Sequence, residues 1–574
     1  MNYVVHLMNI VSVYAILTMS LNLLLGYTGL ISLAHGAFFG LGAYSFALVM
    51  MHTGMGFLAA MVVTILITTL VAILIAIPAL RTRADYLVLL TLGFQVIIFS
   101  LMETQRGLTR GLAGLGGIPR PVIFGFELRT PLQYLPLILG TAIACFLLLS
   151  YLTSSPFGRL MRSMREDEDL VRSYGKDVTR LKVTIFMLAG AFAAIGGGLF
   201  ATYTTFLTPL YFRTETSIVL IAMVALGGMG NLWGSVVGAF TLIVIPEALT
   251  FLAQGGYELV GPVQGIVWGA LLILAMRFRP QGFVPERWTL RRPRLKYDTT
   301  APSSGQLEEG GLQGSPAVPT SEAEVILAAE GLTKAFGGLK AVRQLHVGLL
   351  EGQITALIGS NGAGKTTVFN LITGFEKPDE GRVVYRDTDL TAVSPHRIVR
   401  HGVVRSWQGA RVFGGLTVLE NVLVARPSRT RETLWRILAT PLAVSREEAS
   451  HYPIAMQCLE FVGLNHSAGV LARELSFADQ KMLQVACLLA TEADVLLLDE
   501  PMSGVDPYWI ARTSALLREL VSKGRTLCII EHNLDVVREL ADVAFFLDTG
   551  QVIRVGTPEE LMQDDSLIEL YFGT

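Results

Sequence analysis

The sequence has few charged residues and few cysteines, and each shortage excludes a class of protein. Only 16% of the 574 residues are charged whereas 52% are hydrophobic, which is unusual for a protein that is soluble throughout. The formal net charge of −2 gives no global reason to expect a nucleic acid partner. The four cysteines lie far apart and form no CxxC pair, so neither a disulfide framework nor a zinc site is indicated. The N-terminus lacks a basic region followed by a cleavage site, so we expect its first apolar stretch to be retained.

The hydrophobic residues concentrate before residue 277, in stretches long enough to cross a membrane. A bilayer core of about 30 Å requires roughly 20 apolar residues per helix. About nine uncharged stretches approach that length, and one of them, 217–229, is short enough to be a partial span. They cover residues 4–25, 30–51, 57–80, 86–102, 131–152, 183–206, 217–229, 236–253 and 261–276. The first half is therefore predicted to be an α-helical, multi-pass domain in a lipid bilayer, although the exact number of spans stays open.

Basic residues indicate which loops face the cytoplasm. The interval 154–182 contains seven arginines and lysines, which argues for the cytoplasmic side. Arg81 and Arg83 fall on the same side if every candidate crosses. The segment 277–296 is also basic and leads into the charged, water-soluble half. These positions predict a protein of the cytoplasmic (inner) membrane whose second half lies in the cytosol.

Three polar residues inside predicted spans are candidates for the transport pathway. His35 and Gln95 lie among small or apolar neighbours, and Glu247 interrupts the apolar run 242–251. Polar groups are costly to bury in lipid, so they often mark a pathway. Helix–helix hydrogen bonds are the alternative explanation, and a snorkelling carboxylate is another for Glu247.

Four sequence blocks in the first half resemble one permease family. They are 26–29 with 32–38, 81–86 with 91–92, 155–159 continuing to 165–168, and 227–230 with 234. In this order, over roughly residues 20–285, they resemble the permeases of branched-chain amino acid importers. In that family the interval 159–182 holds the coupling helix, which sits in a groove on the ATPase. The resemblance therefore assigns Arg165, Glu166, Asp167 and Glu168 to a coupling segment.

The composition changes twice along the chain and predicts three regions. Residues 293–322 are rich in Pro, Ser, Gly, Thr and Glu and lack apolar periodicity, which is typical of a tether. From residue 325 onward short apolar runs alternate with helical patterns, which indicates an α/β domain. We expect a transmembrane permease domain at 1–287, a flexible linker at 288–323 and a nucleotide-binding domain at 324–574.

The α/β half opens with a phosphate-binding loop in the context that such a loop requires. A buried strand is predicted at 353–358, and the glycine-rich loop follows it and precedes a helix. The glycines let backbone N–H groups approach phosphates, and the helix N-terminus adds a favourable dipole. Lys365 is expected to bridge the phosphates of ATP, and the Thr366 hydroxyl to ligate Mg²⁺. The candidate ATP contacts are Gly359, Ser360, Asn361, Gly362, Ala363, Gly364, Lys365, Thr366 and Thr367.

A second apolar strand, 495–498, runs into two carboxylates. Asp499 is placed to hold Mg²⁺, and Glu500 to orient or deprotonate the attacking water. This pair and the phosphate-binding loop together resemble the ATP-binding cassette (ABC) ATPases. The resemblance gives roles to the remaining candidates: Gln408 as the Q-loop residue and a further Mg²⁺ contact, His532 as the switch histidine, Asp506 in the D-loop, and Phe336 stacking on adenine.

The signature segment Ser476, Phe477, Ala478 and Asp479 departs from the family pattern. That pattern has glycine at the position of Ala478 and often glutamine at the position of Asp479. In a cassette dimer this segment contacts the γ-phosphate of the ATP that the opposite subunit holds. A methyl group and a carboxylate are both expected to weaken the contact. We therefore predict one fast and one slow ATP site in the assembled transporter.

The sequence predicts ATP-driven import of branched-chain or related apolar amino acids, with ATP and Mg²⁺ as cofactors. The chain supplies one permease and one cassette, so it requires a second of each, either from a second copy or from related subunits. The family also implies an extracytoplasmic substrate-binding protein. Urea, amides or small carboxylates are alternative cargoes. An ABC exporter, or a nucleotide-responsive regulator that moves no cargo, are rival functions.

Overall fold

The computed structural model describes residues 2–79, 84–123, 125–252, 277–286, 324–428 and 432–564, with positions 266, 269, 270, 273 and 567. Contacts divide the chain into two compact units. The first comprises Met1–Arg165 and Thr179–Ala301, and the second Glu166–Val178 and Pro302–Thr574. The predicted linker 288–323 lies outside the described residues, as do Arg81 and Arg83. The three predicted domain ranges stay predictions.

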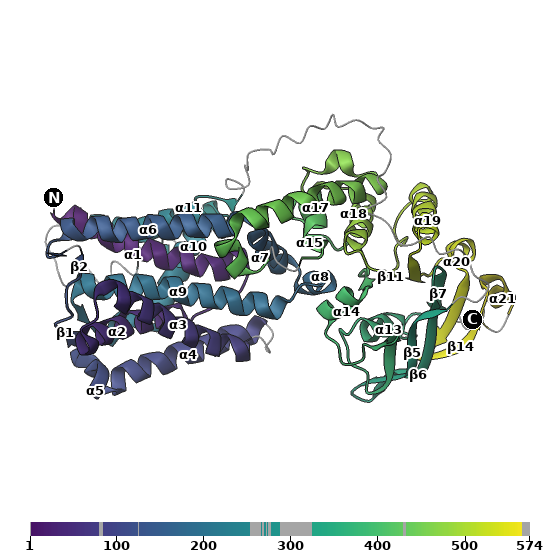
Figure 1. Ribbon diagram of the computed structural model, residues 1–574, viewed down its shortest axis with the longest axis horizontal. Helices are drawn as coiled ribbons and strands as arrows, with labels where there is room; N and C mark the ends of the chain where they lie inside the picture. Colours follow the sequence, from purple (N-terminus) through teal and green to yellow (C-terminus); the bar gives the residue numbers. More distant parts are fainter. Residues whose placement is uncertain are drawn as a thin grey trace. The chain divides into compact units, whose positions relative to one another are not determined.

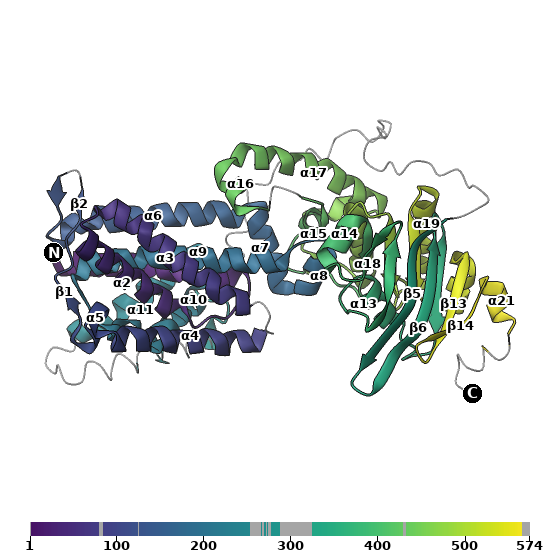
Figure 2. The ribbon, with the colours of Figure 1, turned by 60° about the horizontal axis from the view of Figure 1, so that its bottom comes forward.

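The first unit is built from long apolar helices that lie side by side (Figures 1 and 2). The long helices are α1 (Asn2–Asn22), α2 (His35–Thr53), α3 (Phe57–Ala79), α4 (Ala84–Thr104), α6 (Pro131–Ser154), α9 (Val178–Thr204), α10 (Thr214–Gly227) and α11 (Leu232–Leu252). Shorter elements join them: η1 (Leu23–Tyr27), α5 (Arg106–Thr109), η2 (Gly111–Ala113), β1 (Leu115–Gly116), β2 (Val122–Ile123), β3 (Phe126–Glu127), α7 (Pro156–Glu166), β4 (Phe206–Leu207) and η3 (Pro209–Phe212).

The helices agree with most of the predicted spans. Six of those described, α1, α2, α3, α4, α6 and α9, are each long and apolar enough to cross a bilayer. The helix pair α10 and α11 bends by 120° at a short break, so the predicted stretches 217–229 and 236–253 together make either one broken span or a re-entrant loop. Most of the predicted stretch 261–276 lies outside the described residues. The α-helical fold class of this half is confirmed.

Glycines allow the two arms of the α10–α11 hairpin to pack backbone against backbone. A Cβ atom added at Gly227 would lie 1.9 Å from the Gly234 carbonyl oxygen, and one at Gly238 would lie 1.9 Å from the Met223 oxygen. Gly228, at the break, has a φ of 131°, which side chains rarely tolerate. Asn22 also fastens the break to α1, since its Oδ1 accepts a hydrogen bond from the Gly230 N–H at 3.0 Å. The glycine block 227–230 with 234 therefore marks a tight helical hairpin.

The second unit contains two β-sheets and their flanking helices (Figure 1). The six-stranded sheet has the order β10 (Val403–Arg405), β11 (Val495–Asp499), β12 (Thr526–Ile530), β7 (Ile354–Gly359), β13 (Val543–Asp548) and β14 (Gln551–Gly556). Its first five strands are parallel, and β14 is antiparallel to β13. The antiparallel four-stranded sheet has the order β6 (Leu339–Leu350), β5 (Val325–Phe336), β8 (Glu380–Tyr385) and β9 (Thr388–Asp389).

Helices complete the second unit. They are α8 (Glu168–Ser173), α13 (Lys365–Ile372), α14 (Pro395–His401), α15 (Val418–Ala425), α16 (Leu434–Ala439), α17 (Pro441–Phe461), α18 (Phe477–Ala490), α19 (Pro507–Ser522), α20 (Leu534–Leu540) and α21 (Pro558–Met562), with η6 (Asn465–Ser467) and η7 (Ala472–Glu474). One buried apolar cluster joins both sheets to α13, for example through Leu327, Leu357 and Phe369. The predicted α/β fold is confirmed, as are the predicted strands before the phosphate-binding loop and before Asp499.

The close packing of α10 on α11 yields a test. We expect Gly238→Ala to lower the melting temperature of the detergent-solubilised chain, because the new methyl group meets the Met223 carbonyl and such overpacking costs typically about 1–3 kcal/mol. Gly140→Ala on α6 is the matched control, since nothing lies within 4 Å of its added Cβ atom. Equal melting temperatures for the two variants would contradict this packing.

Candidate functional site

The phosphate-binding loop joins the end of β7 to the start of α13. Gly359 closes the strand with a φ of 151°, and Gly364 caps the helix with a φ of 97°. A side chain at Gly364 could not fit, because its Cβ atom would lie 2.5 Å from the Ala341 carbonyl oxygen. The glycines predicted to shape this loop are therefore required by its backbone.

Lys365 is held inside the loop by its own backbone. Its Nζ donates hydrogen bonds to the carbonyl oxygens of Gly359 at 2.7 Å and Ser360 at 2.9 Å. Burial lowers the pKa of Lys365, while the carboxylates Glu500 and Asp499 oppose that shift. The ammonium group is thus prearranged where incoming phosphate oxygens could replace the two carbonyls as acceptors.

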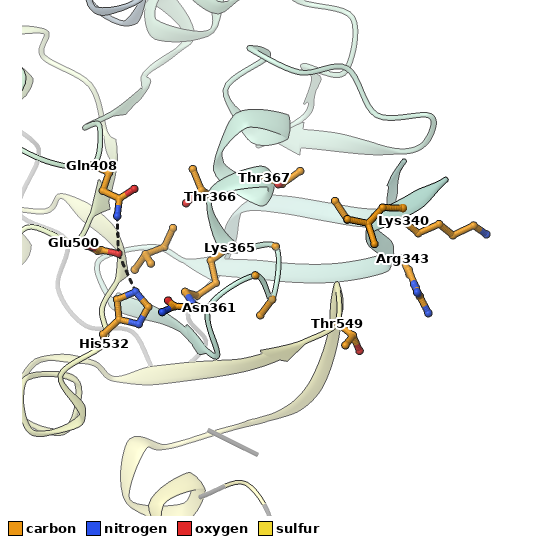
Figure 3. A pocket seen from close by; sticks show the side chains of 16 residues that line it. Lys340, Arg343, Asn361, Lys365, Thr366, Thr367, Gln408, Glu500, His532 and Thr549 are labelled. Atoms are coloured by element: carbon orange, nitrogen blue, oxygen red, sulfur yellow. Dashed lines mark hydrogen bonds and ion pairs between the residues drawn. The ribbon is translucent and has the colours of Figure 1, made fainter. Parts of the chain in front are cut away.

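Three predicted catalytic side chains converge across the same cavity (Figure 3). Gln408 Nε2 donates to Glu500 Oε1 at 3.1 Å, and His532 Nε2 lies 2.8 Å from the same oxygen. Glu500 has the left-handed φ of 51°, which turns the chain sharply just after β11. A glutamate held between an amide and an imidazole, beside a phosphate-binding loop, suits the activation of a water molecule.

The cavity has a volume of about 400 Å³ and is lined by residues from several segments of the second unit. Besides the side chains above, the lining includes Asn361 to Thr367, the β6 residues Leu339, Lys340, Ala341 and Arg343, and the residues Ile530 and Thr549. Lys340 and Arg343 were not predicted, although both follow the aromatic Phe336 within a few residues and carry the charge that phosphates attract. Phe336 itself is about half exposed and does not line the cavity.

Asp499 lies at the end of β11 and is almost fully buried. Its Oδ2 forms an ion pair with Arg405 at 3.4 Å, whereas its Oδ1 is buried with no hydrogen-bond partner in the described part of the chain. Burial raises the pKa of Asp499, and the neighbouring Arg405 opposes that shift. Burial also lowers the pKa of Arg405, to about 10.

The unpartnered oxygen of Asp499 fits a hard divalent cation. Among the described residues, no three His, Cys, Asp or Glu side chains gather closely enough to hold a metal ion by themselves. Mg²⁺ is commonly bound by one or two carboxylates together with phosphate oxygens and water, so Asp499 with a bound nucleotide is an adequate donor set.

The signature segment does not line this cavity. Ser476 caps the N-terminus of α18, and its hydroxyl donates to Asp479 Oδ2 at 2.8 Å while accepting from the Asp479 N–H at 3.1 Å. Phe477 is about half exposed. Asp506 caps α19 by accepting from the Trp509 N–H at 3.1 Å. Asp479 therefore places a carboxylate at the N-terminal end of α18, which is the helix end that the resemblance predicts to contact phosphate.

The predicted coupling residues divide between the two units. Arg165 belongs to the first unit, where it pairs with Glu286 at 2.9 Å. Glu166 and Asp167 belong to the second: Glu166 accepts from the Gly415 N–H at 3.0 and 3.1 Å, and Asp167 pairs with Arg411 at 3.5 Å.

Other contacts of the segment 166–178 were not predicted. Glu168 pairs with Arg172 inside the segment. Lys176 Nζ donates to Glu432 and to the Arg426 carbonyl, both at 2.7 Å. Burial and the neighbouring Cys487 thiol raise the pKa of Tyr174 well above its usual value. Sequence reasoning missed Tyr174 and Lys176 because only a partner surface distinguishes them from other residues of a charged loop.

The three candidate pathway residues all have polar partners. His35 is fully buried, with Nε2 2.7 Å from Ser20 Oγ. Gln95 accepts from the Ala37 N–H at 2.6 Å and donates to the Phe212 carbonyl at 2.7 Å, so it joins three parts of the helical unit. Glu247 accepts from the Tyr3 hydroxyl at 2.7 Å. These bonds agree with helix–helix contacts, and a role in transport stays a prediction.

Fold and site together define an ABC-type ATPase joined to a helical membrane permease. Residues 3–276 match the family described as branched-chain amino acid transport system / permease component, and residues 342–503 match the family described as ABC transporter.

Different relatives match each half. The high-affinity branched-chain amino acid transport ATP-binding protein LivG of Salmonella typhimurium is 37% identical over 249 residues, covering 43% of this chain and 98% of the relative. The probable LivG of Archaeoglobus fulgidus is 36% identical, covering 43% and 95%. The permease protein LivM of Salmonella typhimurium is 33% identical over 308 residues, covering 50% and 69%. The chain belongs to the branched-chain amino acid ABC transporter family, and its cassette binds ATP and is an ATP hydrolase.

The position of Glu500 yields a prediction about the chemical step. Replacing it by glutamine is expected to lower ATP hydrolysis by at least about a hundredfold, because an amide cannot accept the proton of the attacking water. Binding of a fluorescent ATP analogue is expected to be unchanged. Glu519→Gln is the control, since Glu519 lies on α19 outside the cavity and pairs with Lys523 at the end of that helix. Wild-type turnover in the Glu500→Gln variant would contradict this role.

Proposed function

We propose that this chain imports branched-chain or related apolar amino acids across the inner membrane, using the hydrolysis of ATP. The observation that carries the proposal is that both halves independently match one transport family, one through a permease and one through an ATP-binding protein. The relatives are named as an ATP-binding protein and a permease protein of branched-chain amino acid transport. This chain joins the two kinds of component in one polypeptide.

The residues of the cassette have distinct proposed roles. Backbone N–H groups of residues 359–367 and the ammonium group of Lys365 bind the phosphates. Thr366, Gln408 and Asp499 hold Mg²⁺, which supplies charge neutralisation at the phosphates. Glu500 takes the proton of the attacking water, and His532 and Gln408 keep its carboxylate in place. Phe336 packs against the adenine ring.

The assembly is proposed to contain two permeases and two cassettes. Because this chain supplies one of each, the signature residues 476–479 and Asp506 act on the ATP held by the second cassette, from a related subunit or a second copy. Binding of two ATP molecules closes the cassettes, the segments that dock on them move, and the permeases change the side to which they open. An extracytoplasmic binding protein delivers the cargo.

Import is testable with the complex that contains this chain and its co-purifying partners, reconstituted in liposomes. We expect a leucine-loaded binding protein to stimulate ATP hydrolysis and to drive accumulation of leucine on the side of the membrane that carries the cassettes. Stimulation only by urea, amide or carboxylate cargo would change the substrate class. Strong activity without a binding protein, with directional efflux, would favour an exporter, and a nucleotide response without movement of cargo would favour a regulator.

The hydrogen bond between Ser476 and Asp479 within the signature segment leads to a prediction about the two ATP sites. In the double variant Ala478→Gly, Asp479→Gln, we expect the turnover of the assembled complex to rise about fivefold, which corresponds to about 1 kcal/mol, the scale of a charge at a helix end. The reason is that the Ser476 hydroxyl is then free to donate to phosphate. Glu474→Gln, which removes a nearby charge outside the signature, is the control. Unchanged turnover in the double variant would contradict a slow site.

A further inference from the structure

Two arginines and a tryptophan form a stack beside the catalytic glutamine. The guanidinium carbon of Arg405 lies 4.3 Å from the centre of the Trp407 ring, and that of Arg411 lies 4.7 Å from the same ring. The ring of Phe375 meets Trp407 edge-on at 4.8 Å. Cation–π contacts strengthen as water is excluded, and the side chain of Arg405 is only 1% exposed. The positions of both arginine side chains therefore depend on their contacts with the indole ring of Trp407.

The inner end of this stack is fastened to Asp499. Besides the ion pair with Asp499, Arg405 donates to Asn370 and to the Ser406 carbonyl, the latter at 3.1 Å. The Ser406 hydroxyl also accepts from the Asp499 N–H at 2.8 Å. The residue pair 405–406 thus fixes both the carboxylate and the backbone of Asp499, and leaves only its Oδ1 for a cation.

The outer end of the stack is fastened to the segment 166–178, which belongs to the same compact unit. Arg411 pairs with Asp167, and Glu166 accepts from the Gly415 N–H four residues further along the loop. The ring of Tyr174 contacts Phe413 edge-on at 6.1 Å. Three side chains of the segment thereby contact the loop 411–415. This loop in turn places the guanidinium group of Arg411 against the Trp407 ring.

We infer that the stack Arg405–Trp407–Arg411 is a positioning link through which docking of the segment 166–178 sets the orientation of Asp499. Asp167 neutralises Arg411, which is close enough to act on the like-charged Arg405. Loss of Asp167 releases Arg411 from its place on Trp407, and loss of Arg411 removes that contact altogether. In both cases the stack shifts, and Arg405 transmits the shift to the Asp499 carboxylate. The link is separate from the contact of Gln408 with Glu500. It rests on the metal-binding role proposed for Asp499.

The test measures cation binding rather than turnover. The full-length chain in lipid nanodiscs carries Glu500→Gln to prevent hydrolysis, and Mn²⁺ is titrated at saturating ATP with free Mn²⁺ followed by electron paramagnetic resonance. We expect Asp167→Asn and Arg411→Gln each to weaken Mn²⁺ binding about threefold, within the range of known couplings between sites. The double variant is expected to equal either single variant, because both break the same link.

A purely electrostatic effect of the substituted charges on the bound cation predicts different results for the same variants. Removing the negative Asp167 would then weaken cation binding, whereas removing the positive Arg411 would strengthen it, and in the double variant the two effects would add. Opposite or additive shifts would therefore overturn the link. In a Trp407→Leu background, Asp167→Asn is expected to have no further effect, and a persisting effect would also overturn it.

Two further variants distinguish failure of this link from a general loss of contact by the segment 166–178, and from failure of the metal-binding role proposed for Asp499. Glu432→Gln removes the 2.7 Å ion pair with Lys176 in the same segment but does not touch the stack, so Mn²⁺ binding is expected to be unchanged. An equal loss in Glu432→Gln would mean that the stack is not the route. Asp499→Asn is expected to abolish most Mn²⁺ binding, and failure of that control would refute the metal role of Asp499 itself.

Discussion

The parallel register of the central sheet is the constraint on which the ATP site depends. In a parallel sheet the carboxyl ends of neighbouring strands meet at one edge. Here Ile530 of β12 is paired with Leu357 of β7 on one side and with Asp499 of β11 on the other. The phosphate-binding loop, Glu500 and His532 each follow directly after one of these strands, and β10 brings Gln408 to the same edge. A shift in register between any two strands would separate groups that lie within hydrogen-bond distance of one another.

The same arrangement forces charged groups into a poorly hydrated region. Asp499 is the last residue of a strand that is buried throughout, so burial raises its pKa and the nearby cations favour its charged form. Glu531, at the end of the next strand, is also buried with a raised pKa, and it accepts from the Met502 N–H at 2.8 Å. That bond holds the turn after Glu500. Buried charges are costly unless they are paired and hydrogen-bonded, which explains why Arg405 is buried with them.

Much of this site could be predicted from the sequence, because its main features are local. The glycines around Lys365, the strand before Asp499 and the order of Gln408, Ser476, Asp506 and His532 all follow from motifs a few residues long. The stack of Arg405, Trp407 and Arg411 could not be predicted in the same way. No motif indicates that its members contact one another, and its partners Asp499 and Asp167 are remote in sequence. In the helical half, the hairpin of α10 and α11 was predicted only as two separate stretches, 217–229 and 236–253, since hydropathy measures length and not a bend of 120°.

The contacts of the segment 166–178 suit a docking that responds to events at the ATP site. The pair of Asp167 and Arg411 is partly exposed and 3.5 Å long, and such pairs contribute only about 0–1 kcal/mol. Strong affinity is not required, because the segment 166–178 and the loop 411–415 are parts of one chain and their contact is intramolecular. Weak individual contacts can therefore form and break while the chain keeps the two segments tethered. What matters in such an arrangement is which contacts are made, not how strong they are. Because the stack ends on Asp499, a weak surface ion pair can affect the orientation of a buried carboxylate.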